Sequence, residues 1–272
     1  MQLYYNGFIP FCVYTTYFTL PPELSHYIKN YVGSEEFIKD KHRYVFWLNE
    51  KTYQEVRDNS IVQKRVEAVK ANRLASSASS TQAAAKTPYA FVQKGEYDEA
   101  YATFKASGED EFLQLFVPSV SSGNREYVPM GFFDKETIIA APNSVVYNSP
   151  IWLLGLLQSR LHMIWLDAVG GKLKTDYRYS TSLVYNTFPV PELSTRRKNM
   201  IEEQVFEILD LREELGGTLA ELYHKDTMPE SLREAHKKLD EIVERAYKDT
   251  PFNSDEERLS HLLKRYKEMT HE

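Results

Sequence analysis

The sequence predicts an α+β protein: a mixed, β-rich domain of short strands and packed helices at residues 1–192, followed by a small helical bundle at residues 193–272. Before residue 192 the chain is rich in aromatic and β-branched residues and is punctuated by Pro and Gly, which is typical of short strands joined by turns. After residue 192, apolar residues recur at helical spacing nearly to the end. A length of 272 residues allows two domains that each bury a core.

Short strands are expected throughout the first domain. HRYVFWL (42–48) and FLQLFV (112–117) are runs of apolar and aromatic residues, and the second run ends at Pro118. Further strands are expected at 126–130, 137–140 and 144–147.

Two helices are expected in the same domain. Residues 53–74 are typical of a basic amphipathic helix, and its candidate buried positions are Val56, Val62, Val66 and Val69. The small residues of SSASSTQAAAK (76–86) then predict a mobile loop. The second helix is expected over 150–168, with Ser149 as N-cap, Pro150 in the first turn and the Gly170-Gly171 pair as its stop.

The C-terminal region predicts helices joined by short loops. After Pro189-Val190-Pro191, the first helix covers 197–215 and ends at a glycine pair. The later helices start at three signals: the Thr218/Glu221 capping box, Pro229, and Ser254 with Glu257. We expect these segments to form a small antiparallel bundle.

The charge of the chain is unevenly distributed. The formal net charge is -6, which by itself argues against a phosphate-rich partner. Residues 41–94, however, carry ten basic and four acidic side chains, whereas residues 95–272 carry 21 and 31. Such a cluster is typical of an electrostatic contact surface, and equally of a solvated basic helix face.

Cysteine usage and hydropathy favour a cytoplasmic protein. Cys12 is the only cysteine, so neither an internal disulfide nor a cysteine-based zinc site can form, and a reducing compartment is expected. The apolar opening segment lacks a basic start and is interrupted by Asn6, Gly7 and Pro10, which argues against a signal peptide. No other run approaches the roughly 18 apolar residues that span a bilayer, so no membrane partner is expected.

The sequence has no common catalytic or metal-binding motif. A Gly-rich phosphate loop, His-Glu-x-x-His, Gly-x-Ser-x-Gly and paired cysteines are missing. His162 lies on an expected core helix and is interpreted as an interior or interface histidine. Asp167 and Asp176 have no His partner, so we expect a helix-end charge and a loop contact. Neither a catalytic residue nor a metal site is therefore expected in this chain.

Two segments are rich in polar side chains that a buried core does not explain. They are VPSVSSGNREYVPMGFF (117–133) and GGKLKTDYRYSTSLVYNTFPVP (170–191). In the second segment, Lys, Arg, Ser and Tyr follow a glycine pair. Glycine lets the backbone come close to a ligand, and these side chains supply donors suited to phosphate oxygens. The alternative is an exposed strand with a polar outer face.

Several strings in these segments resemble MmeI-like DNA methyltransferases and restriction-modification enzymes. SSGNREYVPMGF (121–132) resembles the Ser-Ser-x-x-Arg-x-Tyr-(Ile/Val)-Pro-Met-Gly segment of that family. The other similar strings are LHMIW, GGKLK, YRYS, VYNTFPVP, LAELY and the stretch from Met228-Pro229 to Leu239-Asp240. The resemblance runs in order from Tyr31 to the C-terminus.

The resemblance implies a target-recognition domain at 1–192 and a helical C-terminal domain at 193–272 of an adenine-specific (N6) enzyme. Family members carry a methyltransferase domain ahead of these two, often with a nuclease in front. The Asn-Pro-Pro-(Tyr/Phe) motif and the Phe-x-Gly-x-Gly type loop do not occur in this sequence. S-adenosylmethionine is therefore expected to bind a methyltransferase domain outside this chain, in the same polypeptide or in a partner subunit.

The resemblance also implies double-stranded DNA as partner, in a restriction-modification or phage-defence system. An adenine methyltransferase extrudes its base, so the recognition module must grip the duplex. Backbone contacts are expected from Ser121, Ser122, Arg125, Lys172, Lys174, Arg178 and Ser180. Auxiliary contacts are expected from Lys64, Arg65, Lys70 and Arg73. The candidates for base readout are Asn124, Glu126 and the loop 75–87. We expect residues 121–125 and 172–180 to share one surface.

Two other functions fit the same sequence. A protein-interaction scaffold would carry the basic segment incidentally and would not show steep, salt-dependent binding to DNA. A stand-alone enzyme with an unrecognised site would bind S-adenosylmethionine by itself.

Overall fold

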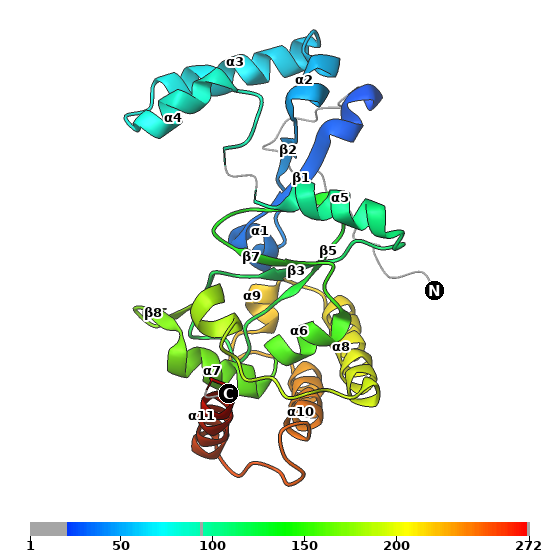
Figure 1. Cartoon of the computed structure of the whole chain (residues 1–272), viewed down its shortest axis with the longest axis vertical. Coiled ribbons are helices and arrows are strands. Elements are labelled where there is room, and N and C mark those ends of the chain that lie inside the picture. Colours follow the sequence, from blue (N-terminus) through cyan, green and yellow to red (C-terminus); the bar gives the residue numbers. More distant parts are fainter. Residues whose placement is uncertain (1–20, 93–94, 271–272) are drawn as a thin grey trace.

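The computed structural model describes residues 21–92 and 95–270 and shows three small sheets surrounded by helices (Figure 1). A helical arm lies at one end of the long axis, two sheets lie in the middle, and the C-terminal helices lie at the other end. The expected α+β class is confirmed, with more helix than strand. Cys12 and the apolar opening segment lie outside the described residues.

The first sheet has the order β2–β1–β6. The chain enters it through a 3-10 turn, η1 (Pro22–Tyr27). β1 (Ile28–Val32) pairs antiparallel with β2 (Tyr44–Phe46) and parallel with β6 (Thr137–Ile139). α1 (Ser34–Lys39) connects β1 to the segment before β2. β2 and β6 confirm two of the predicted strands.

The arm consists of α2 (Glu50–Val56), α3 (Ser60–Leu74), α4 (Ser79–Ala83) and η2 (Ala84–Lys86). The single helix predicted over 53–74 is wrong, because Asn59 accepts a hydrogen bond from the Ile61 N–H at 2.9 Å and starts a new helix there. The predicted loop at 75–87 is also wrong, since α4 and η2 fold back on α3. Of the four valines, Val56 and Val62 are buried and the other two are partly buried.

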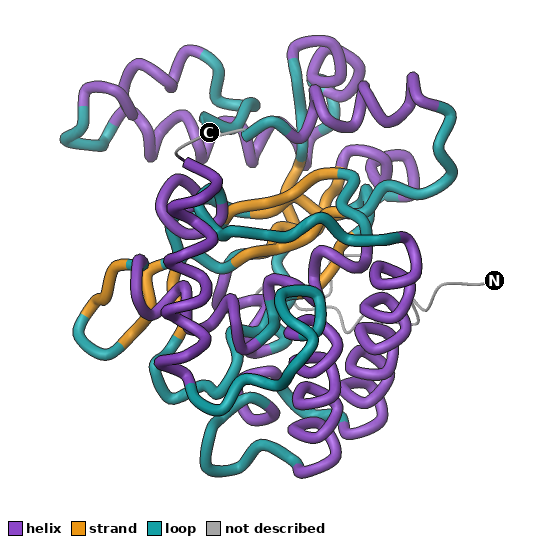
Figure 2. The backbone as a smooth tube through the Cα atoms, turned by 60° about the horizontal axis from the view of Figure 1, so that its bottom comes forward, coloured by secondary structure: helices purple, strands orange, loops and turns teal. Residues whose placement is uncertain are grey.

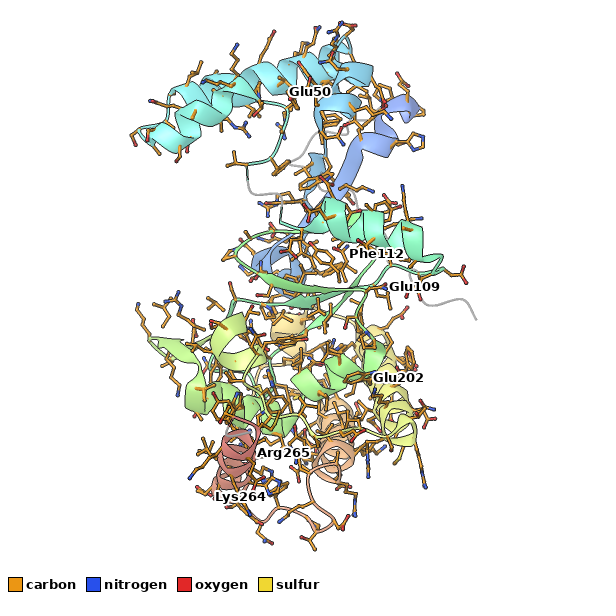
Figure 3. The ribbon with its side chains drawn as sticks, in the orientation of Figure 1. Glu50, Glu109, Phe112, Glu202, Lys264 and Arg265 are labelled. Carbon is orange, nitrogen blue, oxygen red and sulfur yellow. The ribbon has the colours of Figure 1, made fainter. Side chains whose placement is uncertain are left out.

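The second sheet has β3 (Gln114–Val117) between β5 (Gly131–Phe133) and β7 (Ser144–Tyr147). β3 and β7 were predicted, whereas the strand predicted at 126–130 is displaced to β5. α5 (Tyr97–Ser107) packs over this region through an aromatic cluster around Phe112, which Figure 3 labels.

The helix predicted over 150–168 is two helices, α6 (Ile151–Leu157) and α7 (Arg160–Val169). Ser159 separates them, because its Oγ accepts from the His162 N–H at 3.3 Å and donates to the Leu156 carbonyl at 2.8 Å. Pro150 occupies the N-cap position of α6, in place of Ser149.

The C-terminal helices are α8 (Thr195–Leu215), α9 (Leu219–Leu222), α10 (Glu230–Glu244) and α11 (Asp255–Thr270). Both predicted caps form: Thr218 accepts from the Glu221 N–H at 3.3 Å, and Ser254 from the Glu257 N–H at 3.2 Å. α8 and α10 pack on each other and on α6, while α11 packs on α7. One buried core therefore runs from Leu115 to Leu262 and is continuous across residue 192.

No described helix is both long and apolar enough to cross a membrane.

Candidate functional site

The third sheet brings the two polar segments together. β4 (Val120–Ser121) and β8 (Gly171–Leu173) both pair antiparallel with β9 (Asp176–Arg178). Residues 121–125 therefore lie beside residues 172–180, as expected. Figure 2 shows the β8–β9 hairpin projecting from the body of the molecule.

The pairing register separates the residues of this sheet into two faces. Paired residues on neighbouring strands point to the same side of a sheet, and successive residues alternate. One face therefore carries Val120, Gly171, Leu173, Asp176 and Arg178, and the other carries Ser121, Lys172 and Tyr177. The first face is open to solvent, because Arg178 is exposed and Leu173 keeps 55% of its accessible surface. We call it the open face.

Lys172 lies on the opposite face of this sheet, together with Ser121 and Tyr177. Its Nζ lies 2.8 Å from Asp167 Oδ1 near the end of α7, and this carboxylate raises the pKa of Lys172. Asp167 is thus the helix-end charge that was expected. Both side chains are half exposed, so the pair contributes little stability and Lys172 can exchange Asp167 for another anion.

The tip of the hairpin lies against the turn after β4. Lys174 has φ 59° and is exposed, as its place in a tight turn requires. A Cβ at Gly123 would lie 2.1 Å from the Thr175 carbonyl oxygen, so only glycine fits there. The Gly123 N–H also donates to Asp176 Oδ1 at 3.3 Å, which makes Asp176 the expected loop contact.

Ser121 supports Arg125 and does not itself face solvent. The Ser121 side chain is buried, and its Oγ accepts from Arg125 Nη1 at 3.2 Å. Burial lowers the pKa of Arg125, and nearby Asp176 opposes that shift. The Arg125 Nε is buried and has no hydrogen-bond partner among the described residues. We therefore assign Ser121 the role of positioning Arg125, instead of the predicted phosphate contact.

Asn124 and Glu126, the predicted readout residues, differ in accessibility. The Asn124 side chain is exposed next to the hairpin tip. Glu126 is engaged in an ion pair with Arg233 of α10, and both side chains are largely covered. Base readout by Glu126 would require breaking this pair, so we no longer assign Glu126 that role.

The serines near the sheet mainly hydrogen-bond the backbone. Ser180 caps a turn of π-helix, η3 (Thr181–Tyr185), by accepting from the Leu183 N–H at 3.3 Å. Ser122 accepts from the Asn124 N–H at 3.3 Å. Both side chains stay partly exposed and keep capacity for a further hydrogen bond.

The arm carries the auxiliary cations. Lys64, Arg65 and Lys70 are exposed on α3. Arg73 instead donates to the carbonyls of Ala84, Thr87 and Ala90 at 2.8, 3.0 and 2.8 Å. Arg73 thereby holds residues 84–90 against α3. Its donors are used inside the arm, so we assign Arg73 a structural role instead of the predicted external contact.

Residues after 192 hold the segment 122–130 in place, which the sequence did not reveal. Tyr223 and Arg212 anchor it: the Glu126 N–H donates to the Tyr223 carbonyl at 3.4 Å, and Arg212 Nη1 donates to the Met130 carbonyl at 2.8 Å. Arg212 also donates to Tyr223 Oη at 2.6 Å and to Gln158 Oε1 at 2.9 Å. We call these contacts the clamp.

Asp240 is a buried carboxylate that also contacts the segment 122–130. Its two oxygens accept from Tyr127 Oη at 2.7 Å and from the Arg160 N–H at 2.6 Å. Burial raises the pKa of Asp240 to about 7, although both hydrogen bonds oppose the shift.

We expect Asp240→Asn to remove part of the pH dependence of stability. Between about pH 4 and about pH 7 the folded protein holds a proton on Asp240 that the unfolded chain has released, so the free energy of unfolding falls as pH rises, by up to about 1.4 kcal/mol per unit. The amide cannot ionise and can still bond both partners. Urea unfolding across this range measures the slope. The exposed Asp226→Asn is the control, and an undiminished fall in Asp240→Asn would contradict the assignment.

His162 is the interior histidine that was expected. It is fully buried on α7, and its Nε2 lies 3.0 Å from Tyr179 Oη. Burial lowers the pKa of His162 to about 3, so the ring is neutral. The contact connects the core to the residue that follows β9.

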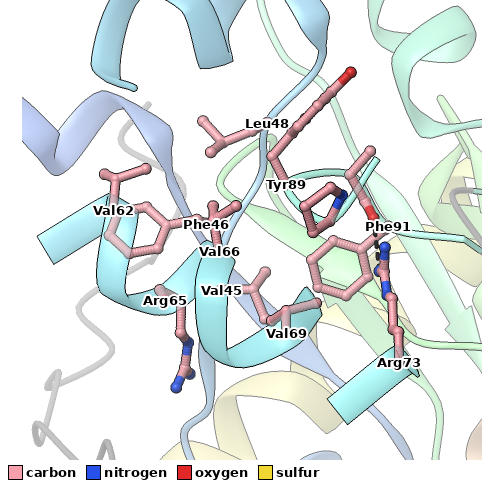
Figure 4. A pocket seen from close by; sticks show the side chains of 12 residues that line it. Val45, Phe46, Leu48, Val62, Arg65, Val66, Val69, Arg73, Tyr89 and Phe91 are labelled. Carbon is pink, nitrogen blue, oxygen red and sulfur yellow. Dashed lines mark hydrogen bonds between the residues drawn. The ribbon is translucent and has the colours of Figure 1, made fainter. Parts of the chain in front are cut away.

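An apolar groove of about 280 Å³ lies between α3, β2 and residues 88–91 (Figure 4). Its only charged lining residues are Arg65 and Arg73, and Arg65 points away from the apolar side chains. No group of His, Cys, Asp and Glu among the described residues is arranged to hold a metal ion.

Two family models cover nearly the whole chain. The model of the MmeI target recognition domain matches residues 15–192, and the model of the MmeI C-terminal domain matches residues 193–272. The chain belongs to the MmeI family. The resemblance seen in SSGNREYVPMGF and the other strings is thereby confirmed.

Two relatives of this MmeI-family chain are informative. DNA methyltransferase A of Bacillus subtilis (strain 168) is 51% identical over 257 residues, which are 94% of this chain and 28% of that protein. The structure of the Type IIL restriction-modification enzyme MmeI in complex with DNA matches with a TM-score of 0.79 and 34% identity, over 92% of this chain and 32% of that one. The chain thus spans about a third of the length of these relatives.

Proposed function

We propose that the chain is the sequence-specific DNA-recognition module of an adenine-N6 DNA methyltransferase in a restriction-modification or phage-defence system. The observation that carries the proposal is the pairing of β4 with β9, which brings both polar segments into one small sheet and leaves Arg178 exposed on its open face. The relatives support it, since one is named a DNA methyltransferase and the other was solved with DNA.

The projecting hairpin is a two-stranded antiparallel ribbon. The major groove of B-DNA admits a two-stranded β-ribbon, and each base pair presents a distinct pattern of donors and acceptors there. The direct contacts that we propose come from Ser122, Asn124, Arg125, Lys172, Lys174, Arg178 and Ser180. Ser121 and Glu126 support this surface from beneath.

The arm supplies a second set of contacts in this proposal. Both views show the arm and the hairpin projecting to the same side of the molecule (Figures 1 and 2). Lys64, Arg65 and Lys70 would meet phosphates at a distance from the hairpin, and such contacts fix orientation without reading sequence.

The lining of the apolar groove does not fit S-adenosylmethionine. Adenosine-containing cofactors are commonly held by a carboxylate on the ribose hydroxyls, and the sulfonium is a cation. The groove of Figure 4 offers two arginines and no carboxylate. We propose that a methyltransferase domain outside this chain, in the same polypeptide or a partner subunit, binds the cofactor.

We expect Arg178→Ala to weaken binding to every duplex sequence and to lower the salt slope by about 0.9, because each neutralised phosphate contributes that much to the slope. Fluorescence anisotropy with a labelled mixed-sequence duplex, titrated at several salt concentrations, measures both quantities.

Arg196→Ala is the matched control for this experiment, because Arg196 is an exposed arginine in the first turn of α8, away from the hairpin. A normal slope in Arg178→Ala would remove Arg178 from the contact surface. If the unchanged chain binds DNA without a steep salt dependence, the protein-interaction scaffold is the better description.

A further inference from the structure

We infer that the turn after α9 adds one more cation, Lys225, to the DNA-contact surface, so that the C-terminal part of the chain touches the phosphate backbone directly. The inference rests on the proposed function and extends it. All contacts proposed above come from residues before 192, whereas Lys225 lies between α9 and α10.

Lys225 is the cross-strand neighbour of Asn124. An isolated antiparallel bridge pairs Arg125 with His224, which sets Asn124 opposite Lys225. The Lys225 N–H donates to the Asn124 carbonyl at 2.8 Å. Opposed side chains of an antiparallel pair start about 5 Å apart. Both of these side chains are exposed, so they form part of one surface.

Asn124 connects Lys225 to the tip of the hairpin. Gly123 lies against the Thr175 carbonyl so closely that no side chain fits between them. Lys174 precedes Thr175 and is exposed. Lys174, Asn124 and Lys225 therefore follow one another across three segments of the chain. We call these three residues the tip row.

The backbone of Lys225 is fixed from the protein side. Arg233 Nη2 donates to the Lys225 carbonyl at 3.3 Å, and the same guanidinium pairs with Glu126. Tyr223, two residues earlier, is fully buried in the clamp. The turn that presents Lys225 is therefore held in one conformation, and less conformational entropy is lost when its side chain binds.

The charge of Lys225 is not compensated by a carboxylate of the described residues. Among residues 21–92 and 95–270, no carboxylate lies within ion-pair distance of Lys225, and Asp226 faces His224 at 3.8 Å. The lysines of α10 differ, since Lys237 and Lys238 are both paired with glutamates. A free cation opposite Asn124 can neutralise a phosphate without first breaking an ion pair.

We expect Lys225→Ala in the full chain to lower the salt slope of duplex binding by about 0.9. Affinity should then fall about 3.5-fold less than in the unchanged chain when salt rises from about 50 to about 200 mM. Lys225→Arg should keep the slope. The measurement is anisotropy with the same mixed-sequence duplex, after circular dichroism has shown that each variant is folded.

Lys238→Ala removes the same charge from α10 and should leave the slope unchanged. If Lys225→Ala leaves the slope unchanged while Arg178→Ala lowers it, the inference about Lys225 is overturned and the proposed function stands. If the unchanged chain shows no salt-dependent binding, the proposed function fails and the role of Lys225 fails with it. An equal loss in Lys238→Ala and Lys225→Ala would show a long-range charge effect and also overturn the inference.

Discussion

Arg212→Met is expected to lower the free energy of unfolding by about 3 kcal/mol. Arg212 donates to Tyr223 Oη, to Gln158 Oε1 and to the Met130 carbonyl at 2.6 to 2.9 Å. Its loss leaves the Gln158 and Met130 oxygens without this donor, while Tyr223 Oη keeps its contact with His236 Nε2 at 2.8 Å. Methionine keeps most of the side-chain volume and removes only the charge and the donors. Urea unfolding followed by circular dichroism measures the difference.

The control for Arg212 lies on the same helix. Arg196→Ala changes an exposed arginine of α8 and should shift stability by no more than about 0.5 kcal/mol. The interpretation of the clamp is wrong if the two variants are equally stable. Arg212→Lys should fall between them, because a single ammonium cannot reproduce a planar fork of donors.

Gly155→Val is expected to cost about 3 kcal/mol through overpacking. A Cβ at Gly155 would lie 2.3 Å from Ile201 Cγ2 and 3.0 Å from Val205 Cγ2, so α6 and α8 would have to move apart. Thermal unfolding is a sufficient measurement, and the expected result is a lower Tm with the fold retained.

A second substitution distinguishes this clash from other effects of valine in a helix. Ile201→Ala creates space next to Gly155, so the double variant should be more stable than the sum of the two single changes predicts. Additive losses would show that the close approach of α6 and α8 is not the cause.

The elements that could be predicted are those whose signals are local. The caps at Thr218 and Ser254 and the strands around β3 and β7 depend on neighbouring residues only. Each of the two misjudged helices contains an internal N-cap residue. Asn59 and Ser159 each interrupt the helix for one turn, after which the spacing of apolar residues continues. Periodicity alone therefore does not detect the break.

The site could be predicted in part. The polar composition of 121–125 and 172–180 indicated the surface, but residue type did not show which side chains face outward. Once the register of β9 is known, the alternation of strand residues separates Lys172 from Arg178. The partners of Glu126 and Tyr127 lie more than a hundred residues later in the sequence, and no local pattern points to them.

Because the core continues across residue 192, the two sides of this boundary depend on each other when segments are exchanged between related proteins. A crossover at residue 192 between diverged relatives would unite Glu126 and Tyr127 of one parent with residues 233 and 240 of the other. Such a hybrid would keep its hydrogen bonds only where both parents supply matching partners. A segment transferred between relatives therefore keeps its supporting contacts only if it includes the whole core from Leu115 to Leu262, with the hairpin and helices α8 to α11 exchanged together.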